Sequence, residues 1–149
     1  MTFGHPLLFL FDGHALIHRG FHALPNLTTK KGQPTGAVYG FAAMLLKVLA
    51  DFKPPYCAVT FDSAAPTFRH VQFEDYKAQR PEAPSELIAQ FKTVRELVQA
   101  FNIPIFQLDG YEADDLLGTI SRYTSAQGIE TAIVTGDNDI LQPVSRPVQ

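Results

Sequence analysis

Acidic side chains that could do chemistry gather in one short stretch of the sequence. Residues 110–115 read GYEADD and place Glu112, Asp114 and Asp115 within four positions. Carboxylates this close repel one another, so the stretch needs a compensating partner. It is either the acid-rich first turn of a helix, which answers the helix dipole, or part of a cage for divalent metal ions.

Further aspartates follow short apolar runs elsewhere in the chain. Asp12 ends LLFLFD, Asp62 ends YCAVTFD and Asp137 ends TAIVTGD, with Asp139 two residues later. Such runs predict buried strands of a parallel sheet, and ligands bind beyond the carboxyl ends of these strands. A lone aspartate after a strand is more often a turn residue or a helix cap. Acids after every predicted strand, however, favour a metal site.

The donor atoms predict the kind of ion. All seven acids offer oxygen, without cysteine or histidine partners, which indicates Mg²⁺ or Mn²⁺ rather than zinc. At about 100° per residue, Glu112 and Asp115 lie roughly 60° apart around a helix, and Asp114 lies about 100° from Asp115. Side chains that fan out in this way suit two neighbouring ions, which together can activate water and stabilise both the attacking and the leaving oxygen of a phosphodiester.

The elements that must position these acids alternate along the chain. Apolar runs predict strands at residues 7–12, 56–62, 103–108 and 131–137, and helical spacing predicts helices at 35–52, 85–101 and 112–128. Ser85 is the predicted N-cap of the second helix, and Gly128 closes the third. This alternation predicts an α/β domain with a mostly parallel central sheet.

The segment at residues 63–84 does not fit the alternation. It mixes aromatic residues with Arg69, Lys77 and Arg80. A connection this long in a compact domain is usually functional or disordered, and its composition argues against plain disorder. Aromatic and basic side chains together are what binding of single-stranded nucleic acid requires. An ordinary solvated surface segment remains the alternative.

Charge and cysteine content narrow the classes of protein. The net charge of −3 argues at first against a nucleic-acid partner. Setting the seven acids aside leaves 8 of the 15 acids against 12 Lys and Arg residues, which suits a metal enzyme acting on a polyanion as well as an ordinary acidic protein. Cys57 is the only cysteine, and the first apolar run is too short to cross a membrane, so we expect a cytoplasmic protein without a membrane partner.

Several ordered motifs resemble the N-terminal half of the 5′→3′ exonuclease domain of bacterial DNA polymerase I, a relative of the flap endonucleases. In chain order they are LFDGHALIHRGFHAL, LTTKKGQPTGAVYGF, VTFDSAAPTFRH, YKAQRP, GYEADDLLGT and TGDNDILQ. The resemblance implies a PIN-like, three-layer fold over residues 1–149, hydrolysis of DNA from a 5′ end or 5′ flap, and two divalent ions.

The resemblance also assigns metal ligands. The first metal cluster of the family matches Asp12, Asp62, Glu112 and Asp114, and the second matches Asp115, Asp137 and Asp139. The histidines at positions 14, 18 and 22 have a spacing that could also chelate a metal on a helix. The carboxylates already account for the metal.

Residues 63–84 match the helical arch of the family, through which a 5′ single strand passes. There Tyr76 would offer a stacking face, and Lys77 and Arg80 would meet the phosphates near the scissile bond. Arg19 is a further possible DNA contact, although an arginine on a helix flank is as often structural.

The chain departs from the family pattern at its end. Asn138 stands where the family usually has lysine, which removes one local positive charge and should have a modest effect. The sequence ends after ILQPVSRPVQ, before the helix–hairpin–helix-like element and the further aspartates of the second metal site. We therefore expect a fragment, a truncated reading frame or one piece of a split protein, whose partner is the missing half or a polymerase domain.

Three functions stay open at this point. The first is a metal-dependent 5′ nuclease that is only weakly active without the missing half. The second is a DNA-binding remnant that does not cleave. The third is a small-molecule Mg²⁺ phosphatase, which would have no need of the segment at residues 63–84.

Overall fold

The computed structural model describes residues 6–73, 75–78 and 81–136. Its elements are β1 (Leu7–Asp12), α1 (Gly13–Ala23), α2 (Gly36–Phe52), β2 (Tyr56–Thr60), α3 (Phe68–Gln72), α4 (Ser85–Ala100), β3 (Ile105–Phe106), α5 (Ala113–Ala126) and β4 (Glu130–Val134). Within these residues no helix has both the length and the apolar character needed to cross a membrane.

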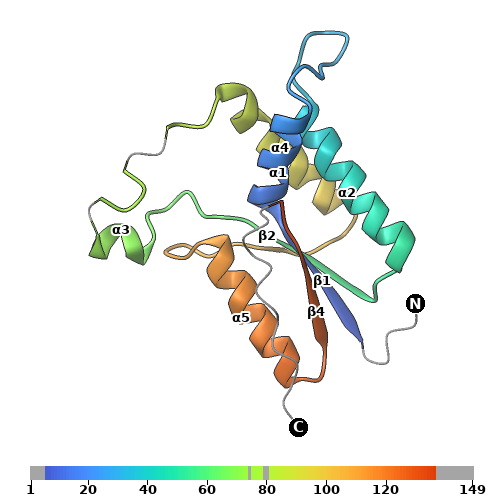
Figure 1. Ribbon diagram of the computed structural model, residues 1–149, viewed down its shortest axis with the longest axis vertical. Coiled ribbons are helices and arrows are strands. Elements are labelled where there is room, and N and C mark those ends of the chain that lie inside the picture. The colour runs from blue at the N-terminus through green and yellow to red at the C-terminus, as the bar shows by residue number, and fades with distance from the viewer. Residues whose placement is uncertain (1–5, 74, 79–80, 137–149) are drawn as a thin grey trace.

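A parallel sheet lies at the centre of the molecule (Figure 1). The strand order of the described residues is β3-β2-β1-β4, and every pairing is parallel. The inner strand β1 is buried along its whole length, as its five apolar residues before Asp12 predict. The predicted α/β class with a parallel sheet is thereby confirmed.

Helices cover both faces of this sheet (Figure 1). Helices α1, α2 and α4 pack on one face, over a core that includes Phe11, Phe41 and Phe61. Helix α5 packs on the other face, where Leu10 and Leu117 belong to a smaller core cluster. The arrangement has three layers, and it brings the start of α5 to the carboxyl edge of the sheet.

Glycines let α1 and α2 approach closely. A Cβ atom built at Gly40 of α2 would lie 2.7 Å from the Cα of Gly20 in α1. Close backbone contact of this kind excludes any larger residue at the crossing. The contact holds α1, which begins directly after Asp12, firmly against the rest of the helical layer.

The structure shortens some predicted elements and adds others. Strand β3 is limited to Ile105–Phe106, directly after Pro104, which cannot donate a ladder hydrogen bond. The prediction of Ser85 as an N-cap is wrong, because Pro84 is the cap and Ser85 is the first helical residue. Gly128 follows the end of α5 with φ +74, as predicted for a closing glycine. Helices α1 and α3 are additions to the predicted set.

Candidate active site

Asp12 is a buried carboxylate at the end of β1. Only 4% of the residue is exposed. Its Oδ1 accepts a hydrogen bond from the Ala15 backbone N–H (3.0 Å), which caps α1, and its Oδ2 accepts one from the Thr135 hydroxyl (3.3 Å). Burial raises the pKa of Asp12, and the nearby charges of Asp114 and Asp62 raise it further, against the opposing effect of the Ala15 hydrogen bond.

Asp62 lies just after β2 and is held by two other elements. Its backbone N–H donates to Nδ1 of His14 in α1 (3.1 Å). Its Oδ1 accepts a hydrogen bond of 2.6 Å from the N–H of Ala113, the first residue of α5. A carboxylate at a helix N-terminus is favoured by the exposed N–H groups and by the helix dipole.

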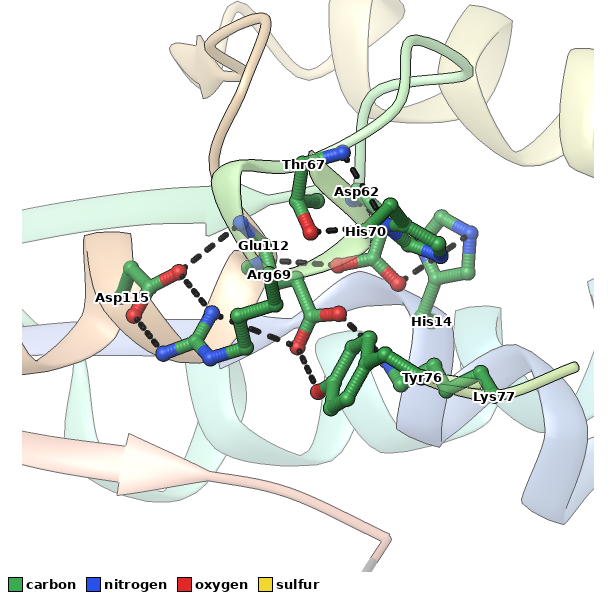
Figure 2. Close-up of polar contacts among 10 residues, drawn as sticks. His14, Asp62, Thr67, Arg69, His70, Tyr76, Lys77, Glu112 and Asp115 are labelled. Carbon is green, nitrogen blue, oxygen red and sulfur yellow. Dashed lines mark hydrogen bonds and ion pairs between the residues drawn. The ribbon is translucent and has the colours of Figure 1, made fainter. Parts of the chain in front are cut away.

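Glu112 is the N-cap residue of α5, and its side chain is held by the segment at residues 63–84 (Figure 2). Lys77 Nζ donates to Oε1 (2.6 Å), and the Tyr76 hydroxyl donates to Oε2 (3.2 Å). Lys77 has φ 58, in the left-handed region that side-chain-bearing residues rarely adopt. Backbone strain at such a position is typical of functional segments.

Asp115 forms the most complete ion pair of the site (Figure 2). Arg69 donates to both of its carboxylate oxygens, at 2.8 and 2.7 Å, and the Glu112 backbone N–H donates to Oδ2 at 3.0 Å. These hydrogen bonds from Arg69 are the main reason that the pKa of Asp115 is lowered. The Arg69 guanidinium also lies over the ring of Phe68, 4.5 Å from its centroid.

Asp114 belongs to the same turn but has a different environment. The residue is solvent-exposed overall, yet desolvation of its carboxyl group raises its pKa, and the charges of Asp62 and Glu112 raise it further. The pKa of Asp114 is therefore shifted upward while that of Asp115 is shifted downward. The two shifts differ because burial dominates at Asp114, whereas the hydrogen bonds from Arg69 dominate at Asp115.

The structure brings most of the predicted acids to one edge of the sheet. Those it describes are Asp12, Asp62, Glu112, Asp114 and Asp115, which come from the ends of β1 and β2 and from the start of α5. Of the predicted DNA contacts, Tyr76 and Lys77 reach Glu112, while Arg19 is exposed on α1. Three predicted site residues lie outside the described part of the chain: Arg80, Asp137 and Asp139.

The acids have the right chemistry to bind divalent metal ions, but the present arrangement of the described ones does not form a metal site. Among the described residues, no group of three or more acidic, histidine or cysteine side chains is arranged to hold an ion. The reason is visible at Glu112 and Asp115, whose oxygens are engaged by Lys77 and Arg69. The chemistry of the acids nevertheless fits, because all offer oxygen. Burial, and after it the charges of neighbouring carboxylates, raises the pKa of Asp12 and of Asp114.

An open cavity of about 350 Å³ lies beside these acids. It is bounded by Asp62 and Glu112 on the side of the sheet and by Thr67, His70 and Lys77 on the side of the 63–84 segment. Its volume is within the range of small-ligand pockets. A ligand in this cavity would lie between the carboxylates and the basic side chain of Lys77.

Sequence reasoning missed two side chains that shape the site. From the sequence, Arg69 is only one of the basic residues of the 63–84 segment, although in the structure it pairs with Asp115. His14 is noticed there only for its spacing from other histidines, although it contacts Asp62. The signal for His14 is its place in the helical turn directly after Asp12, where a side chain can reach the next strand end.

The three-layer fold around a parallel sheet is the PIN-like fold of the flap nucleases. Residues 7–149 match the family described as the 5′-3′ exonuclease, N-terminal resolvase-like domain, and the chain belongs to this family. The resemblance inferred from the sequence motifs is thereby confirmed.

Relatives of this chain include DNA polymerases and a shorter exonuclease. The chain is 49% identical over 147 residues to DNA polymerase I of Chloroflexus aurantiacus, covering 97% of this chain and 16% of that protein. It is 41% identical over 141 residues to the 5′-3′ exonuclease of Aquifex aeolicus, covering 95% of this chain and 49% of that protein. The chain thus spans half or less of the length of these relatives.

Solved structures with the same fold come from bacteriophage T5. The T5 D15 protein co-crystallized with metal ions superimposes with a TM-score of 0.70 at 18% identity, covering 89% of this chain and 50% of that one. The T5 D15 flap endonuclease in a pseudo-enzyme-product complex with DNA and metal ions gives a TM-score of 0.63 at 24% identity, covering 89% and 49%. At these identities the likeness establishes the fold.

Proposed function

We propose that residues 1–149 form the N-terminal domain of a metal-dependent 5′→3′ exonuclease or 5′-flap endonuclease that hydrolyses DNA phosphodiester bonds. Residues 63–84 are its arch. The observation that carries the proposal is the meeting of carboxylates from β1, β2 and α5 with Tyr76 and Lys77 from that segment. An acidic edge beneath basic and aromatic side chains suits both the metal ions and the polyanion.

The proposed metal ligands fall into two groups. Asp12, Asp62, Glu112 and Asp114 would hold one divalent ion, and Asp115, Asp137 and Asp139 would hold a second, with Mg²⁺ or Mn²⁺ as the ion. Bound ions of this kind supply an activated water and positive charge for the phosphodiester oxygens. The burial of Asp12 and the hydrogen bond from Ala113 to Asp62 fix these two carboxylates before any ion binds.

The proposed DNA contacts lie mostly on the 63–84 segment. Lys77 and Arg80 would be the catalytic cations that neutralise charge on the phosphate. Tyr76 would stack on a base of the 5′ strand, and Arg19 would contact a phosphate. In support, Lys77 and Tyr76 donate hydrogen bonds to Glu112, which brings both side chains next to a proposed metal ligand.

The contacts of Arg69 and Lys77 suggest how the protein tolerates its crowded acids without metal. Arg69 pairs with Asp115 at 2.7 Å and lies 3.7 Å from Glu112, and Lys77 pairs with Glu112 at 2.6 Å. Binding of ions to these carboxylates would release both cations toward the phosphates of the DNA. The same side chains would therefore serve the metal-free and the DNA-bound protein in turn.

The alternative is a DNA-binding fragment that does not cleave. It is favoured by the described residues, among which no group of three or more acidic, histidine or cysteine side chains is arranged to hold an ion, while Arg69 and Lys77 engage Asp115 and Glu112. A small-molecule phosphatase is disfavoured, because it gives no role to the contacts between the 63–84 segment and the carboxylates.

The test is cleavage of a 5′-labelled flap duplex by the purified chain, with Mg²⁺, Mn²⁺ or EDTA. Asp114→Ala should abolish metal-dependent cleavage, whereas Asp51→Ala, which removes an exposed acid paired with Lys47, should leave it unchanged. Equal cleavage by the Asp114→Ala variant would contradict the proposed mechanism. Flap binding without cleavage by a folded chain would establish the alternative.

A further inference from the structure

His14 makes an unusual contact with one of the proposed metal ligands (Figure 2). It is the second residue of α1, two positions after Asp12. Its Nδ1 accepts the backbone N–H of Asp62 at 3.1 Å, whereas its Nε2 lies 3.9 Å from Asp62 Oδ2, too far for a hydrogen bond. The contact is therefore made to the backbone of Asp62 and leaves its carboxylate available.

The ring of His14 is fixed by aromatic neighbours. Phe91 of α4 lies 4.6 Å from it between ring centroids, and Phe61 lies 5.9 Å away in an edge-on arrangement. A Cβ atom at the neighbouring Gly13 would lie 2.5 Å from the Phe61 ring, so the start of α1 is pressed against the end of β2. This packing leaves the His14 ring little freedom to rotate, so Nδ1 stays directed at the Asp62 backbone.

The hydrogen bond to His14 replaces a strand partner that the Asp62 N–H lacks at the end of the sheet. The N–H of Phe61 still donates to the Phe106 carbonyl across the sheet, at 2.9 Å. One residue later the pairing of β2 with β3 has ended, and His14 provides the acceptor for Asp62. On the other side, the N–H of Ala113 holds the Asp62 carboxylate at 2.6 Å. Asp62 is thus held at its backbone by α1 and at its side chain by α5.

We infer that His14 is a positioning residue that sets Asp62 relative to Asp12. Asp12 accepts from Ala15 in the same helical turn that carries His14, so one turn of α1 holds the carboxylate of Asp12 and the backbone of Asp62. This inference rests on the proposed function, in which the two acids bind one ion. Partners that orient metal ligands in this way typically contribute about 10- to 100-fold to metal affinity.

Three substitutions separate this role from simple packing. In His14→Asn the Oδ1 atom stands one bond from Cγ, as Nδ1 does, and can accept the same hydrogen bond. In His14→Gln the acceptor lies one bond further out. In His14→Phe the ring is kept and the acceptor is lost. The probe is Mn²⁺ alone, titrated calorimetrically into the chain, with the melting temperature measured separately in EDTA.

We expect Mn²⁺ affinity and melting temperature to change independently: one variant should lose affinity and another should lose thermal stability. His14→Phe should keep its melting temperature close to that of the unchanged chain and lose about tenfold or more in Mn²⁺ affinity. His14→Asn should melt earlier, because it loses the contacts with Phe61 and Phe91, yet bind Mn²⁺ within about threefold of the unchanged chain. His14→Gln should lose both. A packing role alone would make affinity follow melting temperature.

An Mn²⁺ affinity in His14→Phe equal to that of the unchanged chain, or a loss in His14→Asn as large as in His14→Phe, would overturn the inference. Asp12→Ala is the reference variant. If it abolishes Mn²⁺ binding while His14→Phe keeps the affinity of the unchanged chain, only the positioning role fails. If the unchanged chain does not bind Mn²⁺, or Asp12→Ala has no effect, the proposed metal site fails as well.

Discussion

At the scale of single residues, the buried carboxylate of Asp12 lowers the stability of the metal-free protein. Its pKa in the folded chain lies above the unfolded value of 3.8, mainly because of burial. A group of this kind binds a proton more readily when folded, so its effect on stability worsens as pH rises through the folded pKa. At neutral pH the charge of Asp12 is therefore a destabilising feature.

Asp12→Asn should raise the free energy of unfolding in EDTA at neutral pH by about 1 kcal/mol, because it removes a buried charge while keeping an acceptor for Ala15. The same variant should lose cleavage. Urea denaturation measures the first effect, and Asp51→Asn, at an exposed position, should shift it by less than about 0.5 kcal/mol. A less stable Asp12→Asn would show that the charge is already compensated.

Asp115 has the opposite electrostatics. Its folded pKa lies below 3.8, mainly because of hydrogen bonds from Arg69. The pair therefore contributes stability above the unfolded pKa, and this contribution is lost as pH falls through the folded pKa. Arg69→Gln should lower the free energy of unfolding at pH 7 by about 1 kcal/mol, since the pair is partly exposed and partly screened.

The pH dependence checks this assignment by urea denaturation. The difference between Arg69→Gln and the unchanged chain should shrink as pH is lowered below the usual pKa of an aspartate, because Asp115 becomes neutral in both. A difference that stays constant across this range would mean that Arg69 stabilises through its contact with Phe68 rather than through the carboxylate.

At the scale of elements, the crossing of α1 and α2 depends on absent side chains. Gly40→Ala should destabilise the chain by about 1 to 3 kcal/mol, because the new Cβ would meet the Gly20 backbone. Gly118→Ala is the matched control, since nothing lies within 4 Å of a Cβ there, and it should stabilise α5 by about 0.5 to 1 kcal/mol. Thermal unfolding of both variants decides; a tolerated Gly40→Ala would mean that the helices can separate.

The elements themselves could be predicted from the sequence because their signals are local. The apolar run that forms β1 and the helical spacing that forms α2 are each contained in one stretch of chain. The convergence of Asp12 and Asp62 follows from the geometry of a parallel sheet. The pairing of Arg69 with Asp115 joins residues 46 positions apart across an irregular segment, and no periodic pattern encodes such a contact.

At the scale of the whole molecule, the two faces of the sheet are covered unequally. Beside α5 an apolar cavity of about 510 Å³ lies over β2 and β3, and it is lined by Cys57, Phe106 and Tyr123 among others. Tyr123 is 70% exposed. Because Cys57 is the only cysteine of the chain, its reactivity measures how accessible this face is to solvent.

Burial raises the pKa of the Cys57 thiol above its usual 9.0, so less thiolate is present at any given pH. Alkylation by iodoacetamide should therefore be slower in the folded chain than in urea, with a rate that rises with pH through an inflection above 9.0. Mass spectrometry of quenched samples measures the rate. An inflection below 9.0 would mean that the thiol is open to solvent.

The strand order has a consequence for synthesis on the ribosome. Leu7 of β1 is in register with Glu130 of β4, so the central strand pairs with a segment made more than a hundred residues later. At roughly 5 to 20 residues per second, this partner emerges on the order of ten seconds after β1. During that time one edge of β1, whose residues before Asp12 are all apolar, has no native partner, so we expect the nascent chain to expose an aggregation-prone strand edge until β4 is made.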